Sequence, residues 1–191
     1  MNARHLPVIL ALCILVMFRI FGSLFPETLP NFQPLAALFF CGPLLAPGLR
    51  GLLFPVALWL ITYPFGIGPI TDVPIFLTAL GGLLATFWIG RKFVAKSGYA
   101  IICGSVAAAI VFHLLTNTIA WIGDPTYQKT LTGFWQSQWT GPVVSPIPSW
   151  VFLRNFAAAN VLFSTLFVLA RFKLHLPALK PESKKEFSPV R

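Results

Sequence analysis

Residues 99–123 read YAIICGSVAAAIVFHLLTNTIAWIG, an apolar run that contains no Asp, Glu, Lys or Arg. The hydrocarbon core of a bilayer is about 30 Å thick, and about 20 apolar residues in a helix cross it. This run therefore predicts a transmembrane helix. Because a lipid-exposed backbone must satisfy its own hydrogen bonds, we expect the other apolar runs of the chain to be helical as well.

The composition of the whole chain agrees with a membrane protein. Of its 191 residues 57% are hydrophobic and 10% are charged, and the mean hydropathy is +0.79. A soluble domain carries roughly 25% charged residues, so this chain lacks the polar surface that a water-facing globule needs. The length is used up by about six spans of ~20 residues each, which excludes a separate soluble catalytic domain and a repeat array.

The apolar runs predict an all-α fold, a polytopic transmembrane bundle of about six helices. Pro and Gly separate the runs, and the expected spans are about 6–25, 33–48, 51–65, 74–90, 99–123 and 150–170. The second and third runs are short, so residues 33–65 are expected to form either two full spans or a re-entrant pair. We expect one transmembrane domain over residues 1–171 and a basic cytoplasmic tail over 172–191.

Charged residues separate between the two ends of these spans. With a cytoplasmic N-terminus, the inside segments hold the basic tail together with Arg4, Arg50, Arg91, Lys92 and Lys96. The outside segments hold Glu27, Asp72, Asp124 and Lys129. This distribution follows the positive-inside rule and predicts that both termini are cytoplasmic. The net charge of +9 is assigned to orientation and lipid contact, and no nucleic-acid partner is expected.

The connection between the last two spans is too long for a plain turn. Apolar residues recur in it at helical spacing, at Leu131, Phe134, Trp135 and Trp139, with polar residues between them. This pattern predicts an amphipathic helix within 126–140 at the outer membrane interface. An aromatic-belt loop explains the same residues, and a lid over a binding site is the functional form of the helix.

Polar residues gather toward the outer ends of the predicted spans and form the candidate site. Ionisable groups inside a bilayer are costly and usually mark function or a pairing partner. His113, Asn117 and Trp121 are spaced i, i+4, i+8 and therefore share one helix face. The expected ligand-binding residues are Arg19, Asn31, Gln33, His113, Asn117, Trp121, Arg154 and Asn155.

In this hypothesis the two arginines contact an anionic or carbonyl group, the asparagines orient it, and Trp121 stacks on an apolar or planar part. Each residue also has a structural interpretation. The arginines can extend to the outer headgroups or pair with an outer carboxylate, and the asparagines and His113 can hydrogen-bond between helices. The inner halves of the spans contain almost no polar residues, which favours an outward-facing pocket over a channel or a pump.

Sequence motifs of common enzyme classes are absent. The chain contains no GxxxxGK[ST], HExxH or GxSxG, and its five acidic residues lie in expected loops or in the tail. We therefore expect no catalysis, no metal site and no cofactor. Cys13, Cys41 and Cys103 stand singly in apolar runs and are expected to be buried.

Three stretches resemble signatures of an uncharacterised bacterial membrane-protein family. They are PNFQPLAA at 30–37 with Gly42, LLTN at 114–117 with Trp121, Tyr127, Thr130 and Gly133, and FLRN at 152–155. That family distantly resembles the S components of energy-coupling-factor transporters, which capture a vitamin or metal from outside and pair with a transmembrane coupling subunit and ATPases. The resemblance implies an S-component-like fold, cytoplasmic termini and a bacterial inner-membrane location.

Together these observations predict a multi-pass membrane protein that binds a small solute from the outer side, as the substrate-binding component of an importer. Its expected partners are the lipid bilayer, a vitamin-like or other small solute, and a transmembrane coupling subunit with ATPases. The alternative is a non-catalytic structural subunit of a larger membrane complex. The alternative predicts a filled helical bundle, whereas solute binding predicts an outward cavity larger than about 300 Å³.

Overall fold

The structure, a computed structural model, describes residues 6–24, 29–46, 48–66 and 72–173. Within them the chain forms α1 (Leu6–Leu24), α2 (Leu35–Leu45), the 3-10 helix η2 (Gly48–Leu52), α3 (Leu53–Gly66), α4 (Val73–Arg91), α5 (Gly98–Gly123), α6 (Leu131–Trp139) and α7 (Ser149–Lys173). No strand occurs in the described residues, so the predicted all-α class is confirmed. Of the predicted tail, residues 174–191 lie outside the described part.

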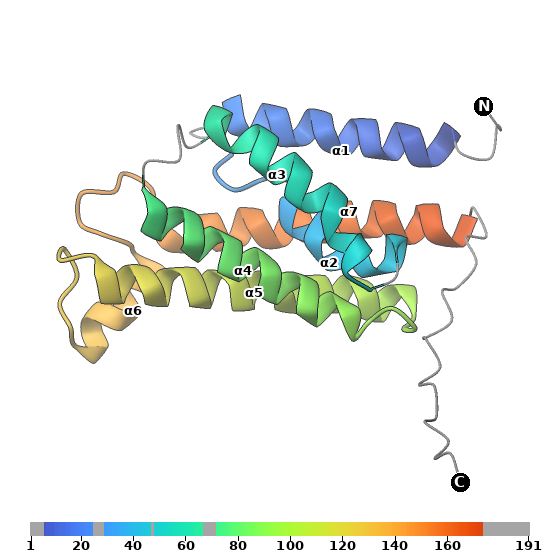
Figure 1. The fold of residues 1–191 in the computed structure, drawn as a ribbon. Helices are drawn as coiled ribbons and strands as arrows, with labels where there is room; N and C mark the ends of the chain where they lie inside the picture. Colours follow the sequence, from blue (N-terminus) through green and yellow to red (C-terminus); the bar gives the residue numbers. More distant parts are fainter. Residues whose placement is uncertain (1–5, 25–28, 47, 67–71, 174–191) are drawn as a thin grey trace, which may run out of the picture.

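The long helices form one elongated bundle with α6 at one end (Figure 1). The helix α1 packs on α3 and α7, while α5 packs on α4 and α7. The start of α1, the α4–α5 connection and the end of α7 lie at the end opposite α6 (Figure 1). Arg91, Lys92 and Lys96 therefore lie at the end opposite Asp72 and Asp124. The helices alternate in direction as the charge pattern requires, and the cytoplasmic location of the basic end stays a prediction.

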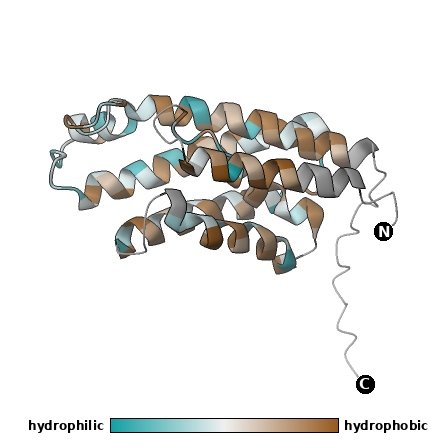
Figure 2. Ribbon diagram, turned by 90° about the horizontal axis from the view of Figure 1, so that it is seen from above, coloured by the Kyte–Doolittle hydropathy of each residue, from teal (hydrophilic) through white to brown (hydrophobic). Residues whose placement is uncertain are grey.

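Among the described helices, three are long and apolar enough to cross a membrane, namely Val73–Arg91, Gly98–Gly123 and Ser149–Ala170. Hydrophobic residues predominate along the bundle (Figure 2). Many of them face outward, as a lipid-facing surface requires; examples are Leu77, Ile110 and Val161, one from each of these helices.

The second predicted span, residues 33–48, is shorter than a membrane-crossing helix. The helix α2 has 11 residues, which extend about 16 Å at 1.5 Å per residue, against a hydrocarbon core of about 30 Å. Its end has a local cause, because Ala46 precedes Pro47 and is extended, as residues before proline prefer. Residues Leu35 to Pro43 are buried, so α2 is the centre of the bundle.

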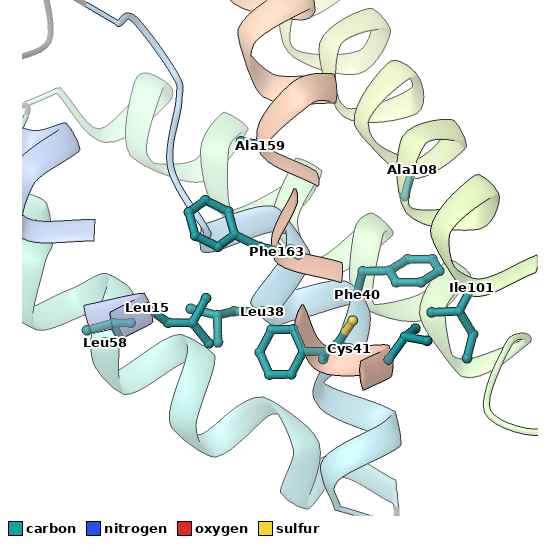
Figure 3. Close-up of a cluster of buried hydrophobic side chains, with 12 residues drawn as sticks. Leu15, Leu38, Phe40, Cys41, Leu58, Ile101, Ala108, Ala159 and Phe163 are labelled. Atoms are coloured by element: carbon teal, nitrogen blue, oxygen red, sulfur yellow. The ribbon is translucent and has the colours of Figure 1, made fainter. Parts of the chain in front are cut away.

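The other helices pack around α2. Leu15 of α1, Leu58 of α3 and Phe163 of α7 belong to one buried cluster with Leu38 of α2 (Figure 3). Phe40 of α2 belongs to the same cluster and contacts Phe93 after α4 with ring centroids 5.5 Å apart. The cluster also contains Ile101 and Ala108 of α5, so the short helix α2 joins four longer helices, α1, α3, α5 and α7.

Side-chain caps begin three of the helices. Asp72 accepts a hydrogen bond from the Ile75 N–H at 3.0 Å at the start of α4. Ser97 and Thr130 act in the same way at the starts of α5 and α6. Such caps satisfy backbone donors that have no partner inside the helix, and they place the loops between the helices.

The prediction for the cysteines is confirmed in part. Cys41 of α2 is buried, whereas Cys13 of α1 and Cys103 of α5 are exposed, so the prediction is wrong for those two. Their position has a simple reason: both lie on outward faces of long apolar helices, where a small apolar side chain needs no burial within the protein.

Candidate functional site

A cavity of about 860 Å³ opens at the end of the bundle where α4 begins and α5 ends. Side chains from α1, α3, α4, α5 and α7 line it, together with the segment before α2. Asp72, Pro74 and Gly123 in its lining are exposed, so the cavity is open to the surroundings. Pockets for small ligands have volumes of about 300–1,000 Å³, and this one is large enough for a solute of that class.

The inner part of the cavity is apolar and will be called the floor, defined by Leu35, Trp59, Leu83, Phe112 and Phe156. The rings of Phe112 and Phe156 lie 4.8 Å apart between α5 and α7. Leu35, Trp59 and Leu83 form part of a second buried cluster with residues of α3 and α4. The floor is therefore held by packed helices and is preformed for an apolar group.

Four of the eight predicted site residues, Arg19, Asn31, Gln33 and Asn117, line the cavity. Arg19 is 4% exposed, and its Nε donates a hydrogen bond to Thr62 Oγ1 at 2.9 Å. Its guanidinium also donates to Gln33 Oε1. Arg19 thus connects α1 to α3 and holds a second lining residue in place. Asn31 has a φ of 59°, in the left-handed region that Asn tolerates better than most residues.

His113 and Trp121, which were predicted on one stripe with Asn117, serve the connection to α6 and do not line the cavity. His113 Nε2 lies 2.9 Å from the Gln138 carbonyl oxygen of α6, and its Nδ1 lies 3.1 Å from Asn117 Nδ2. Trp121 Nε1 donates to the Gln128 carbonyl oxygen at 2.9 Å. These bonds fix the loop and α6 beside the open end of the cavity.

Arg154 and Asn155 also lie outside the cavity lining. Arg154 is exposed, with its guanidinium carbon 5.2 Å from the Trp150 ring centroid. Asn155 is buried, and its Nδ2 donates to the Pro30 carbonyl oxygen at 3.0 Å. Because Pro30 precedes the lining residues Asn31 and Gln33, Asn155 positions the wall of the cavity.

The predicted amphipathic segment is a helix, α6, whose apolar side faces outward. Leu131, Trp135 and Trp139, spaced i, i+4, i+8, are exposed, whereas Ser137 and Gln138 are buried against the bundle. This inverted arrangement suits a helix at a membrane interface. Thr130 caps the helix, and a Cβ at Gly133 would lie 2.0 Å from the Gln128 carbonyl oxygen. The α5–α6 loop therefore packs tightly on α6.

Sequence reasoning missed the lining residues that surround the predicted stripe on α5. Phe112, Thr116, Ala120 and Gly123 line the cavity at i, i+4, i+8 and i+11, one position from His113, Asn117 and Trp121. A single position turns a helix by about 100°. Of these four residues Phe112, Ala120 and Gly123 have no polar side chain, so a search for polar residues does not find them.

From the sequence Asp72 and Asp124 are expected in loops outside the site, yet both line the open end of the cavity. Their position follows from topology: one residue precedes α4, the other follows α5, and these helices pack side by side. Hydrogen bonds from Thr126, one from its backbone N–H at 2.8 Å, hold the pKa of Asp124 below its usual value. Asp124 is therefore ionised at neutral pH.

The arrangement is suited to recognition by apolar contact, hydrogen bonds and charge. Within the described part of the chain, no group of three or more His, Cys, Asp or Glu side chains lies close enough to hold a metal ion. The fold and the cavity define a small helical bundle with three membrane-length helices and a cavity at one end. Residues 1–179 match DUF6580, a family of unknown function, and the chain belongs to that family.

Membership of an uncharacterised family, predicted from the three motifs, is thereby confirmed. No curated protein and no solved structure matches the chain. The motifs meet in space around the cavity. Asn155 of the FLRN motif bonds Pro30 of the PNFQP stretch, and Asn117 of the LLTN motif lines the same cavity as Asn31.

Replacing His113 by Leu is expected to loosen α6. The Gln138 carbonyl oxygen loses its partner, which costs about 1–2 kcal/mol of local stability. Hydrogen–deuterium exchange of the α6 amides in nanodiscs measures this, and they should exchange faster while α7 stays protected. Leu114→Ala, an exposed neighbour on α5, is the control. Equal exchange of α6 in both variants would show that the His113 bond does not hold it.

Proposed function

We propose that this chain captures a small solute in the cavity from the outer side of the membrane, as the substrate-binding component of an importer. The observation that carries the proposal is the cavity of about 860 Å³, with an apolar floor and a polar, open end. The proposal assigns the chain no catalytic step. Energy would come from a transmembrane coupling subunit with ATPases, as in the S components that the sequence resembles.

The position of the cavity supports uptake from outside. Its open end contains Asp72 and Asp124, while Arg91, Lys92 and Lys96 lie at the other end of the bundle. By the positive-inside rule the basic end faces the cytoplasm. A solute would then enter from the outer side, with both termini of the chain inside, in an S-component-like arrangement in the bacterial inner membrane.

The volume of the cavity favours solute binding over the structural-subunit alternative. A subunit that only fills space in a complex is expected to have a packed bundle whose polar residues satisfy one another. Here apolar side chains from four helices and the start of α2 line the cavity. Open space between helices forgoes the contacts that packed side chains would make there, so a cavity of this size supports a role for the space.

Native mass spectrometry of the protein in nanodiscs cut from its own membrane tests this proposal. We expect a stoichiometric small-molecule mass on the wild-type chain. Ala120→Trp places an indole in the cavity and should lower that occupancy about tenfold or more, since it occupies the volume that a drug-sized solute needs. Ala107→Trp, on an exposed face of the same helix, is the matched control and should retain the mass.

Two outcomes would contradict the proposal. A wild-type chain with no bound small molecule but with a stable protein partner that lacks ATPases would support the structural-subunit alternative. A small molecule that stays bound equally in Ala120→Trp and Ala107→Trp would show that the solute occupies another place.

A further inference from the structure

The cavity changes character along its depth in the same way on two helices. Along α4 the lining passes from Asp72 through Thr78 to Leu83, and Leu83 lies about 16 Å deeper along the helix axis. Along α5 it passes from Asp124 through Asn117 to Phe112. On both walls a carboxylate lies at the open end and an apolar residue lies deepest, with a hydrogen-bonding residue and further apolar residues between them. A solute that matches them has one apolar end and one charged end, and the apolar end lies deepest.

The charges at the open end favour a cation there. Asp72 and Asp124 line it, and each carboxylate is held by a backbone N–H, of Ile75 and Thr126 respectively. Lys129 lies near Asp124, and its ammonium group donates hydrogen bonds to the backbone carbonyl oxygens of Trp121 and Asp124. Lys129 is not part of the lining, although its charge is close enough to Asp124 to contribute to the lowered pKa of that carboxyl.

The expected role of the two arginines changes accordingly. Arg154 lies outside the lining, over the Trp150 ring, so it does not offer a second cation to a bound anion. Arg19 lies beside Gln33 and Thr62, deeper than the two carboxylates. Among the described lining residues two carboxylates thus face one guanidinium, and the carboxylates lie where a solute enters. Charge at an entrance steers oppositely charged solutes into a cleft.

We infer that the solute is an amphiphilic amine, which binds with its apolar body on the floor and its ammonium group at the open end that Asp72 and Asp124 line. This inference rests on the proposed function and adds the chemical class of the solute. The aromatic floor accepts a planar or aliphatic body, and Asn31 and Asn117 lie at intermediate depth, where they can bond a polar group between the two ends.

Three probes that share one phenylbutyl body separate the contribution of the head-group charge to binding from that of the apolar body. We would titrate 4-phenylbutylamine, 4-phenylbutanol and 4-phenylbutyrate into the protein in phosphatidylcholine nanodiscs at low salt, with empty nanodiscs as the blank. The amine should bind about tenfold tighter than the carboxylate, because the head groups carry opposite charges next to fixed carboxylates, and added salt should reduce that ratio. Butylamine, which lacks the phenyl ring, should bind about tenfold more weakly than 4-phenylbutylamine.

The variant Asp72→Asn with Asp124→Asn removes both charges and keeps an oxygen acceptor for each backbone N–H, and Asn is a good helix cap. It should bind the amine and the alcohol equally. Glu182→Gln with Glu186→Gln changes the net charge by the same amount in the C-terminal segment and should leave the tenfold preference unchanged.

Equal or tighter binding of the carboxylate by the wild-type chain would overturn the inference while solute binding in the cavity stands. A preference for the amine that survives in the double Asn variant would also overturn it. Binding of none of the probes would overturn it too, and the proposed function would then be decided by the native small-molecule mass and the Ala120→Trp comparison.

Discussion

Replacing Gly90 by Ala is expected to disrupt the packing of α4 on α2 and to lower the folding stability. A Cβ at this position would lie 2.0 Å from the Phe40 carbonyl oxygen, a backbone atom that no side-chain rotation can move. Both Gly90 and Phe40 are buried, and α2 is the helix around which the bundle packs. Overpacking at a close backbone contact costs about 3 kcal/mol, the upper part of the usual range for extra methyl groups in a core.

Thermal unfolding in detergent, followed by size-exclusion chromatography, measures the effect of Gly90→Ala. The matched control is Gly81→Ala on the same helix, where a Cβ would have no neighbour within 4 Å. Ala favours helices over Gly by about 1 kcal/mol, so the control should unfold at the same or a slightly higher temperature. Equal unfolding temperatures for both variants would mean that α2 and α4 do not approach as closely as the structure shows.

Most of the fold could be predicted from the sequence, because apolar runs separated by Pro and Gly mark helices in a bilayer directly. The length of α2 could not. Residues 33–48 are as apolar as the other runs. Pro34 precedes the helix as its N-cap and Pro43 lies inside it, whereas the helix ends at Ala46 before Pro47. The preference of residues before proline for an extended conformation applies to Gly42 before Pro43 as well, yet the helix continues there, so the sequence does not say which proline ends it. The sequence alone therefore left residues 33–65 open between full spans and a re-entrant pair.

The structure brings four of the eight predicted site residues to one cavity and places the other four outside its lining. Hydrogen-bonding residues at one level of the bundle can face the cavity, as Asn117 does, or a neighbouring element, as His113 faces α6. Asn117 and His113 lie one turn apart on α5. Which of them faces the cavity and which faces α6 depends on where α6 packs. That position is set by contacts between residues far apart in the chain, such as Asn155 with Pro30, which periodicity does not reveal.

Polar groups in the inner half of the bundle were also underestimated from the sequence. Ser105 of α5 donates to Ser164 of α7 at 2.9 Å, and Asn160 donates to the Phe156 carbonyl oxygen at 2.8 Å. All three are buried and lie where small residues bring the two helices together. A serine in an apolar run is as compatible with close helix packing as Gly or Ala, so only the structure shows that Ser105 and Ser164 hydrogen-bond across the helix interface.

Replacing Arg19 by Met is expected to loosen α1 from the bundle. Among the described side chains of α1, Leu15 and Arg19 are the buried ones, and they lie one turn apart on one face. Met keeps the length of the side chain but removes the donors to Thr62 and Gln33. Hydrogen bonds from a charged group to buried partners contribute about 2–3 kcal/mol. Because α1 has so few buried contacts, that loss should fall largely on this helix.

Hydrogen–deuterium exchange resolves the effect of Arg19→Met by helix: α1 should lose protection while α5 and α7 retain it. Ile20→Met, an exposed neighbour, is the matched control and should leave α1 protected. Arg19→Lys keeps the charge, but its ammonium group lacks the planar, branched set of donors with which the guanidinium reaches both Thr62 and Gln33. We therefore expect an intermediate loss of protection in α1. If Arg19 instead contacts only the solute, Met would weaken binding without changing the protection of α1. Measuring both the protection of α1 and the binding of the solute therefore separates a structural role of Arg19 from a role in recognition, because only the structural role predicts a loss of protection in α1.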